Sequence, residues 1–415
     1  MKKYEDGAVE CRLDLRKSNW LYVIYYAFNS DLLFWIVIDN LFLTTVKGFN
    51  AFQIVLITML GIAFSLLLYP LTNYIVKKTS NKTSILFGSA CYCIAISLYM
   101  ISNSLLGFII GQTIYNLSSP FRMVANVMLK NNLQEQGRSD EFVKWQSYGK
   151  LGYACVTLIV SLFAGILFNI HAYLPMILSL SCAIIGLSLA ILFKDEPLKT
   201  NAEEVSNGVK LTKLMKNKTM ILVMLMNLVA VGTYVFLQGK ATLLIQYVLE
   251  DVKIDIAKIS IIISVLVFGS RLVRVISNLV FPKIYGKVQN KSKIVLAISA
   301  LILISNLCFA IGGNINAHYV LKLTIITIGF YIILSVRDMY AVCENKIIST
   351  SLRESEQKQA FVLANIYGKL GRLLTNMFAL IILGFMPLNI LYICMLIFAV
   401  IQVFICIPLS KYFKV

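Results

Sequence analysis

Charged side chains interrupt several long apolar runs of this chain, and two aspartates near its start offer the clearest chemistry. Asp31 and Asp39 stand in a stretch apolar enough to cross a bilayer. Asp31 would lie about twelve residues, or roughly 18 Å, into such a helix. Desolvation at that depth favours the protonated form of a carboxylate, so Asp31 could bind and release a proton. The alternative is a structural ion pair with a cation such as Arg122 or Arg337.

Cations outnumber acids among these interrupting residues. A lysine or arginine at membrane depth is costly and normally faces a cavity or a polar partner. A cavity with such an excess of cations would favour an anionic or zwitterionic ligand, although the same arginines could instead form gates. The residues that we expect along the substrate and ion pathway are Asp31, Arg122, Lys150, Lys240, Arg271, Arg337, Asp338, Lys369 and Arg372.

The sequence contains no pattern typical of a metal, redox or nucleotide site. Its nine cysteines are scattered without a C-x-x-C pair, and its two histidines, His171 and His318, stand far apart. No G-x-x-x-x-G-K-[ST] motif is present. We therefore expect no cofactor and no metal, and a membrane enzyme is disfavoured because no nucleophile, His/Asp pair or metal cluster converges near one face.

Composition indicates which elements must hold these side chains. Of 415 residues, 59% are hydrophobic and 14% charged, and the mean hydropathy is +0.79. Soluble proteins carry about 25% charged residues, so the bilayer is the expected solvent and an all-α bundle the expected fold. Apolar runs of about 20 residues predict twelve transmembrane helices: Trp20–Thr45, Ala51–Val76, Ile85–Ser102, Leu105–Leu129, Phe142–Phe168, Tyr173–Phe193, Met220–Leu249, Ile256–Val280, Ile294–Ile311, Tyr319–Val342, Phe361–Leu383 and Ile390–Leu409.

Basic residues separate sharply between the two sets of connections. The set that includes both termini carries almost all of the lysines and arginines outside the spans, whereas the other set carries Lys47, Lys253 and Lys258. Cytoplasmic loops carry such an excess, so we expect a multi-pass cell-membrane protein with both termini cytoplasmic. The net charge of +18 then reflects contact with anionic membrane lipid rather than a nucleic-acid partner. The excess of lysine over arginine indicates a bacterial source.

The chain also repeats itself. The sequence YGKLG at residues 148–152, in the fifth span, recurs at residues 367–371, in the eleventh. The one long polar stretch between spans follows the sixth span. Because many transporters are built from internal repeats, we predict two pseudo-symmetric six-helix bundles at residues 1–193 and 220–415, joined by a cytoplasmic linker loop at residues 194–219.

Each copy of the repeat places a lysine between two glycines. Lys150 and Lys369 could present cations to an anionic substrate from the two halves, or each could extend to the cytoplasmic interface. Glycines at such positions allow helices to approach closely. We interpret the glycines as packing residues and leave both roles of the lysines open.

These features together resemble the major facilitator superfamily: twelve spans, both ends cytoplasmic, a long central loop, and a third helix of each triplet that carries no charge. The family's glycine–aspartate–basic motif between spans two and three corresponds to residues 69–73 followed by Lys77 and Lys78. Tyrosine replaces the glycine, and Asn73 replaces the aspartate. The resemblance implies a gating loop with Asn73, Lys77 and Lys78. The proline of the family's drug/proton antiporter motif is absent from span five.

The resemblance implies a secondary transporter that works by alternating access. We expect a monomer that binds a small-molecule substrate and protons, and we predict proton-coupled efflux. Two alternatives stay open, namely ion-coupled uptake of an anionic or zwitterionic solute, and a non-transporting receptor or immunity-type protein with the same fold.

Overall fold

A computed structural model describes residues 2–194, 216–289, 291–351 and 354–411. These residues form helices and connections without a β-strand, which confirms the predicted all-α membrane fold. The predicted linker at 194–219 lies mostly outside the described residues.

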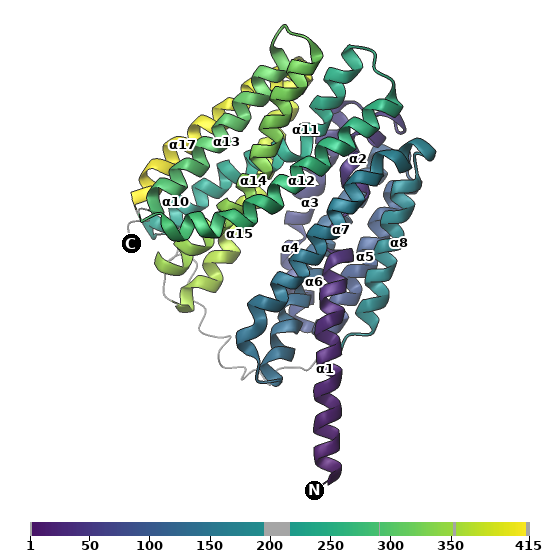
Figure 1. The fold of residues 1–415 in the computed structure, drawn as a ribbon, viewed down its shortest axis with the longest axis vertical. Helices are drawn as coiled ribbons and strands as arrows, with labels where there is room; N and C mark the ends of the chain where they lie inside the picture. Colours follow the sequence, from purple (N-terminus) through teal and green to yellow (C-terminus); the bar gives the residue numbers. More distant parts are fainter. Residues whose placement is uncertain (1, 195–215, 290, 352–353, 412–415) are drawn as a thin grey trace. The chain divides into compact units, whose positions relative to one another are not determined.

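The first part of the chain forms the helices of unit 1 and a segment that joins unit 2. In order these elements are α1 (Lys2–Asn29), α2 (Trp35–Thr45), α3 (Ala51–Leu67), α4 (Tyr69–Lys78), α5 (Asn81–Ile101), α6 (Leu105–Glu135), the 3-10 turn η1 (Ser139–Glu141), α7 (Phe142–Ile170) and α8 (Leu174–Ile191). Within unit 1, α5 packs against α6 and α8, and α1 packs against α7 and α8 (Figure 1).

The second part of the chain forms most of unit 2. Its elements are α10 (Lys218–Met226), the π-helical turn η3 (Asn227–Val231), α11 (Gly232–Asp251), α12 (Ile256–Lys287), α13 (Lys291–Asn314), α14 (Tyr319–Ser351), α15 (Glu354–Phe385), α16 (Leu388–Cys394) and α17 (Leu396–Lys411). Here α13 packs against α14 and α17, α12 against α14, and η3 against α15.

The chain divides into two compact units. Unit 1 comprises Met1–Asp39 and Leu60–Asn201, and unit 2 comprises Asn40–Met59 and Ala202–Val415. The segment 40–59 groups with unit 2 because it bonds to α11. Asn40 Nδ2 donates to Thr242 Oγ1 at 2.7 Å and to the Gly239 carbonyl at 2.9 Å. The end of α2 and the start of α3 therefore belong with α11, which sequence alone does not indicate.

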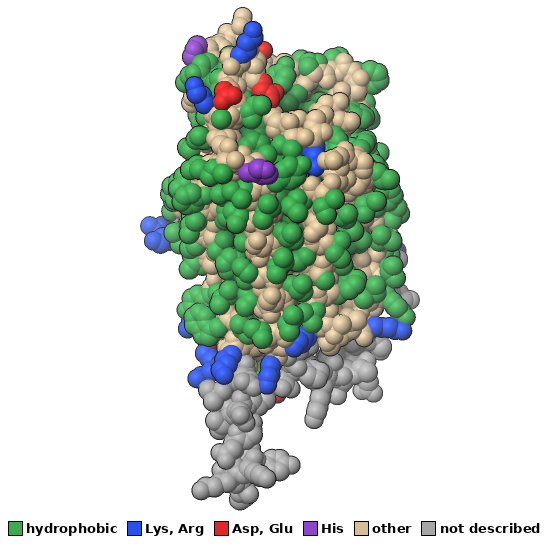
Figure 2. All heavy atoms as spheres, turned by 90° about the vertical axis from the view of Figure 1, so that its right-hand side faces the viewer, with side chains coloured by type: hydrophobic (Ala, Val, Ile, Leu, Met, Phe, Trp, Pro, Cys, Tyr) green, Lys and Arg blue, Asp and Glu red, His purple; other side chains and the backbone are tan. Residues whose placement is uncertain are grey.

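Each predicted span corresponds to a helix or a pair of helices. Among the described residues, nine helices are long and apolar enough to cross a membrane, or up to ten if the bent pair α3–α4 counts as one span. The two predicted spans outside this set are the first, which is broken into α1 and α2, and the fourth, which is α6. Polar side chains such as Gln112, Asn116 and Arg122 occupy α6. Hydrophobic side chains cover most of the face drawn in Figure 2, and Lys and Arg gather along its lower edge.

The predicted gating residues lie at the end of the second predicted span, Ala51–Val76, and in the two residues that follow it. Residues 69–78 form α4, which is bent by 53° from α3. Pro70 explains the bend, because proline is favoured in the first turn of a new helix and disrupts a continuing one. Asn73 and Lys78 are therefore exposed on a helix, and only Thr79 and Ser80 connect α4 to α5. The side chain of Lys77 lies outside the described set.

The repeated glycines pack equivalent helix pairs at different distances. In unit 1, Gly152 of α7 lies against α1, where an added Cβ would meet the Ala27 Cβ at 3.4 Å. In unit 2, Gly371 of α15 lies much closer to η3, and an added Cβ would come within 2.1 Å of the Leu228 carbonyl oxygen. Only the second contact leaves no room for a methyl group.

Gly371→Ala should therefore lower stability by about 1–3 kcal/mol, because the backbone of η3 cannot move aside without strain. Gly384→Ala is the matched control in the same helix, since nothing lies within 4 Å of a Cβ built there. Thermal unfolding of the purified protein should give a lower midpoint for G371A than for G384A, with G152A close to the control. Equal midpoints for G371A and G384A would contradict this packing.

Candidate functional site

The site in unit 1 begins with a break in the first predicted span. Helix α1 ends at Asn29 and α2 begins at Trp35. The last carbonyls of α1 consequently lack the partners that a continuous helix would supply. Arg122 on α6 provides one, because its Nη1 donates to the Asn29 carbonyl oxygen. A cation at a helix C-terminus is also favoured by the helix dipole.

Asp31 lies inside this break and is held by neutral donors. The Tyr115 hydroxyl donates to Oδ1 at 2.8 Å, the Tyr153 hydroxyl donates to Oδ2 at 3.2 Å, and the Leu32 amide donates to Oδ1 at 2.9 Å. Among the described residues of this unit, no ion pair joins Asp31 to Arg122. The structural pairing with Arg122, one of the two alternatives above, is therefore wrong, because that guanidinium is directed to a backbone carbonyl instead.

Arg122 is buried beside two aromatic rings. Its side chain is 8% exposed, and its guanidinium carbon lies 4.1 Å from the ring centroid of Tyr92 and 5.9 Å from that of Tyr115. Contacts of this kind are favourable for a desolvated cation. Its Nε has no hydrogen-bond partner among the described residues. A buried donor without a hydrogen-bond partner costs free energy. An acceptor atom on a bound ligand could supply that partner for Arg122 Nε.

Tyr115 joins these two charges in one arrangement. Its hydroxyl binds the Asp31 carboxylate, while its ring lies beside the Arg122 guanidinium. The break thus brings two of the predicted pathway residues to one place in unit 1. Discontinuous membrane helices of this kind commonly form substrate and ion sites.

The site residues of unit 2 form a different arrangement, because here the acid is paired. Asp338 on α14 accepts from Arg274 on α12 through Nε at 2.7 Å and Nη2 at 2.9 Å, and from Asn278 Nδ2 at 2.7 Å. Arg337 Nε lies 3.8 Å from Asp338 Oδ1, and Arg337 Nη1 donates to Gln238 Oε1 at 3.3 Å. Asp338 therefore connects α12 and α14, while Arg337 extends towards α11.

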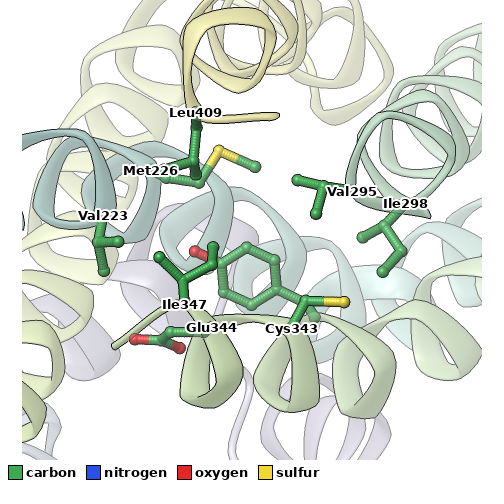
Figure 3. Close-up of a pocket in the computed structure, with 9 residues that line it drawn as sticks. Val223, Met226, Val295, Ile298, Cys343, Glu344, Ile347 and Leu409 are labelled. Carbon is green, nitrogen blue, oxygen red and sulfur yellow. The ribbon is translucent and has the colours of Figure 1, made fainter. Parts of the chain in front are cut away.

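Glu344 is a half-buried carboxylate that the sequence analysis left outside its set of site residues. Asn227 Nδ2 donates to Glu344 Oε1 at 2.5 Å, and the Tyr340 hydroxyl donates to Asn227 Oδ1 at 2.6 Å. Figure 3 shows Glu344 beside apolar side chains such as Met226 and Ile347, around a cavity of about 10 Å³. The predicted span ended at Val342, whereas α14 continues to Ser351. Asn227 lies in the π-helical turn η3, for which the sequence carries no signal.

The other predicted residues are more dispersed. Lys240 is 7% exposed and its Nζ lies 3.4 Å from Thr58 Oγ1, in the segment that groups with unit 2. Lys150 is exposed on α7, whereas Arg271 on α12 and Lys369 and Arg372 on α15 are half-buried. Lys78 Nζ stands 4.6 Å from the ring centroid of its neighbour in the same helix, Tyr74. The roles predicted for these residues stay predictions.

The partners of Asp31 were missed for a physical reason. Tyr115 and Tyr153 lie in spans four and five, among the many aromatic residues of an apolar chain, so their type alone does not single them out. Arg274 was visible as a charge within span eight, but its pairing with Asp338 depends on how α12 crosses α14. Both acids were found in the sequence, while their partners depended on helix packing.

The helical membrane fold agrees with a comparison against protein families. The family model described as Major Facilitator Superfamily matches residues 23–376. The chain belongs to the Major Facilitator Superfamily. Membership makes it a transporter rather than an enzyme, and it confirms the resemblance seen in the sequence.

Solved structures of this superfamily share the fold of the chain. The crystal structure of the nucleoside transporter NupG is 13% identical, with a TM-score of 0.67 over 98% of this chain and 99% of NupG. A point mutant of NupG is 12% identical, with a TM-score of 0.72 over 96% of this chain and 99% of the mutant. A bacterial homologue of the human lysosomal transporter Spinster, inward-facing and unoccupied, is 12% identical, with a TM-score of 0.61 over 98% and 97% of the two chains. No relative matches among curated protein sequences.

The Arg274–Asp338 pair should be structural. Arg274→Gln and Asp338→Asn should each lower the unfolding free energy by about 1–3 kcal/mol, since each removes the two-point contact between these half-buried charges. The double variant should lose less than the sum, with a coupling of about 0.5–3 kcal/mol in a double-mutant cycle of unfolding midpoints. The control cycle combines Arg138→Gln with Glu141→Gln, a local pair three residues apart. For this pair we expect a coupling free energy of at most about 0.5 kcal/mol. Additive losses at Arg274 and Asp338 would show that the pair contributes nothing.

Proposed function

We propose that this transporter moves a small molecule in exchange for protons, with efflux as its direction, and that Asp31 carries the proton. The observation that supports the proposal is the Asp31 carboxylate inside a broken membrane helix, bound by two tyrosine hydroxyls and one amide. A carboxylate with neutral partners can accept a proton without breaking an ion pair. Asp338, by contrast, would have to leave Arg274 first.

Protonation of Asp31 would change the hydrogen bonds that it makes with the groups around it. The charged carboxylate only accepts hydrogen bonds, whereas the protonated form can also donate one. A proton on Oδ1 would require Tyr115 to reorient its hydroxyl, and a proton on Oδ2 would require the same of Tyr153. The ring of Tyr115 lies beside Arg122. We infer that proton binding alters how Arg122 is held at the end of α1, which would couple the proton to the rearrangements of alternating access.

The substrate that fits these residues is an anion or a zwitterion. Arg122 Nε is a buried donor without a partner, and Asn116 Nδ2 on the same helix is another among the described residues. A carboxylate or phosphate oxygen accepts strongly from such donors. NupG is a nucleoside transporter, so a nucleoside belongs in a first panel of compounds, although 13% identity assigns no substrate.

The coupling role of Asp31 can be tested with a single neutral substitution. Asp31→Asn keeps an oxygen acceptor for the tyrosines but cannot bind a proton in this way. A panel of uridine, leucine, citrate and ethidium is first screened by counterflow into proteoliposomes, which requires no proton gradient. With the best compound, D31N should keep counterflow within about threefold and lose gradient-driven accumulation by at least about tenfold, a difference of about 1.4 kcal/mol or more.

The matched control for that experiment is Glu344→Gln, which removes another half-buried carboxylate bound by a neutral partner. It should retain gradient-driven accumulation. If E344Q loses accumulation while D31N keeps it, Asp31 is not the coupling group. The direction follows from vesicle sidedness, because an efflux system accumulates its substrate in energised everted vesicles and an uptake system in right-side-out vesicles.

The charge preference predicts a selective effect at Arg337. Arg337→Gln should reduce transport of citrate by about tenfold or more, because it removes a cation of unit 2, and should leave ethidium transport unchanged or higher. Lys258→Gln, an exposed cation near the start of α12, serves as the control and should change neither. Unchanged citrate transport by R337Q would end the proposal of a cation-lined anion site at this residue.

A further inference from the structure

A groove between α1 and α7 is separate from the site formed by Asp31 and Arg122. It measures about 620 Å³, and exposed residues such as Trp20, Lys144 and Leu151 line it. Its walls come from the end of η1, from α7 and from the part of α1 that carries Arg16 and Trp20. A volume of this size can hold part of a small molecule.

One end of the groove is basic. Arg16 and Lys144 are both exposed there, and among the described residues no carboxylate lies within ion-pair distance of either. Glu141 is the one acid that lines the groove, and it is already paired with Arg138 at 2.6 Å. Two cations therefore remain available to an anion at this end.

Three aromatic rings follow the basic end. Trp20 stacks on Tyr148 with ring centroids 6.5 Å apart, and Trp145 meets Trp20 edge-on at 5.1 Å. Trp20 is 58% exposed, so its ring is accessible from outside the unit. Tryptophan and tyrosine are enriched at the membrane–water interface, where one part of a ring meets lipid and another meets water.

The remaining length of the groove is apolar. Lys144, Tyr148, Leu151 and Cys155 recur every three or four residues along α7 and therefore share one helix face. Cys155 lies about eleven residues beyond Lys144, or roughly 16 Å further along the helix. The groove thus changes from basic to aromatic to apolar in the order in which a phospholipid changes from headgroup to acyl chain.

We propose that the α1/α7 groove binds an anionic phospholipid from the leaflet at this end of unit 1. The phosphate lies between Arg16 and Lys144, the glycerol region lies against the aromatic rings, and an acyl chain follows Leu151 and Cys155. Attraction of anionic lipid is worth about 1 kcal/mol per Lys or Arg near the membrane surface, or about fivefold in affinity for each cation. A zwitterionic lipid would gain little from the same two side chains.

The tryptophans provide a reporter within the groove. The chain has three, Trp20, Trp35 and Trp145, and Trp35→Phe leaves the two that line the groove. In vesicles of mixed lipids, quenching by dibrominated phosphatidylglycerol is compared with quenching by dibrominated phosphatidylcholine to give a relative binding constant. We expect at least about fivefold preference for phosphatidylglycerol in W35F, weakened by high salt as charges are screened.

Charge-matched variants test which cations cause the preference for phosphatidylglycerol. Arg16→Gln with Lys144→Gln, in the W35F background, should bring the relative binding constant close to one. Lys130→Gln with Lys293→Gln removes two exposed cations outside the groove and should leave it within about twofold. Soluble glycerol 3-phosphate in excess should not relieve the quenching, because it lacks the acyl chain.

Three outcomes would overturn the proposal. The first is equal quenching by the two brominated lipids in W35F, which decides the question even if the double variants fail to fold. The second is an equal loss of preference in R16Q/K144Q and K130Q/K293Q, which would show a general surface charge effect. The third is relief of quenching by glycerol 3-phosphate, which would identify the groove as a site for soluble anions. None of these depends on a transport assay.

Discussion

Backbone groups at membrane depth must find partners within the protein, and the first span of this chain leaves some of its own without them. Where α1 stops at Asn29, a carbonyl that a continuous helix would satisfy is exposed in the interior of unit 1. The guanidinium of Arg122 binds it. This contact explains why a buried cation is tolerated and why the chain can remain irregular for several residues. The same irregular residues hold Asp31, so the candidate chemistry depends on the break.

The two repeats show how similar sequence supports different structure. The YGKLG segments pack α7 on α1 in unit 1 and α15 on η3 in unit 2, but the distances differ at Gly152 and Gly371. The closer approach in unit 2 occurs beside the π-helical turn. Such turns are frequent at functional positions, and this one places Asn227 on Glu344. In unit 1 the carboxylate of Asp31 lies in a helix break, whereas in unit 2 the carboxylate of Glu344 is bound by a residue of the π-helical turn.

The acids of the chain differ in what holds them, and this distinguishes their chemistry more clearly than depth does. Asp338 is fixed by a two-point contact with Arg274, so its charge is needed for the crossing of α12 and α14. Asp31 and Glu344 have neutral partners. Removing the cation that holds Asp338 breaks structure, while protonating Asp31 or Glu344 changes hydrogen bonding. The excess of cations is likewise divided between packing, as at Arg122, and surfaces, as at Lys144.

Apolar run length and charge distribution by themselves determined the membrane class and the helical fold, because the bilayer admits few solutions to backbone hydrogen bonding. They also identified Asp31 and Arg122 as unusual. The superfamily was indicated by a resemblance in span number, central loop and the segment at residues 69–78, and the family model over residues 23–376 shows it. Tertiary structure alone decided that Arg122 binds the Asn29 carbonyl rather than Asp31, that tyrosines hold Asp31, and that the second predicted span bends by 53° between α3 and α4. Hydropathy reports the cost of placing a charge in lipid, whereas the partner of that charge depends on where neighbouring helices cross.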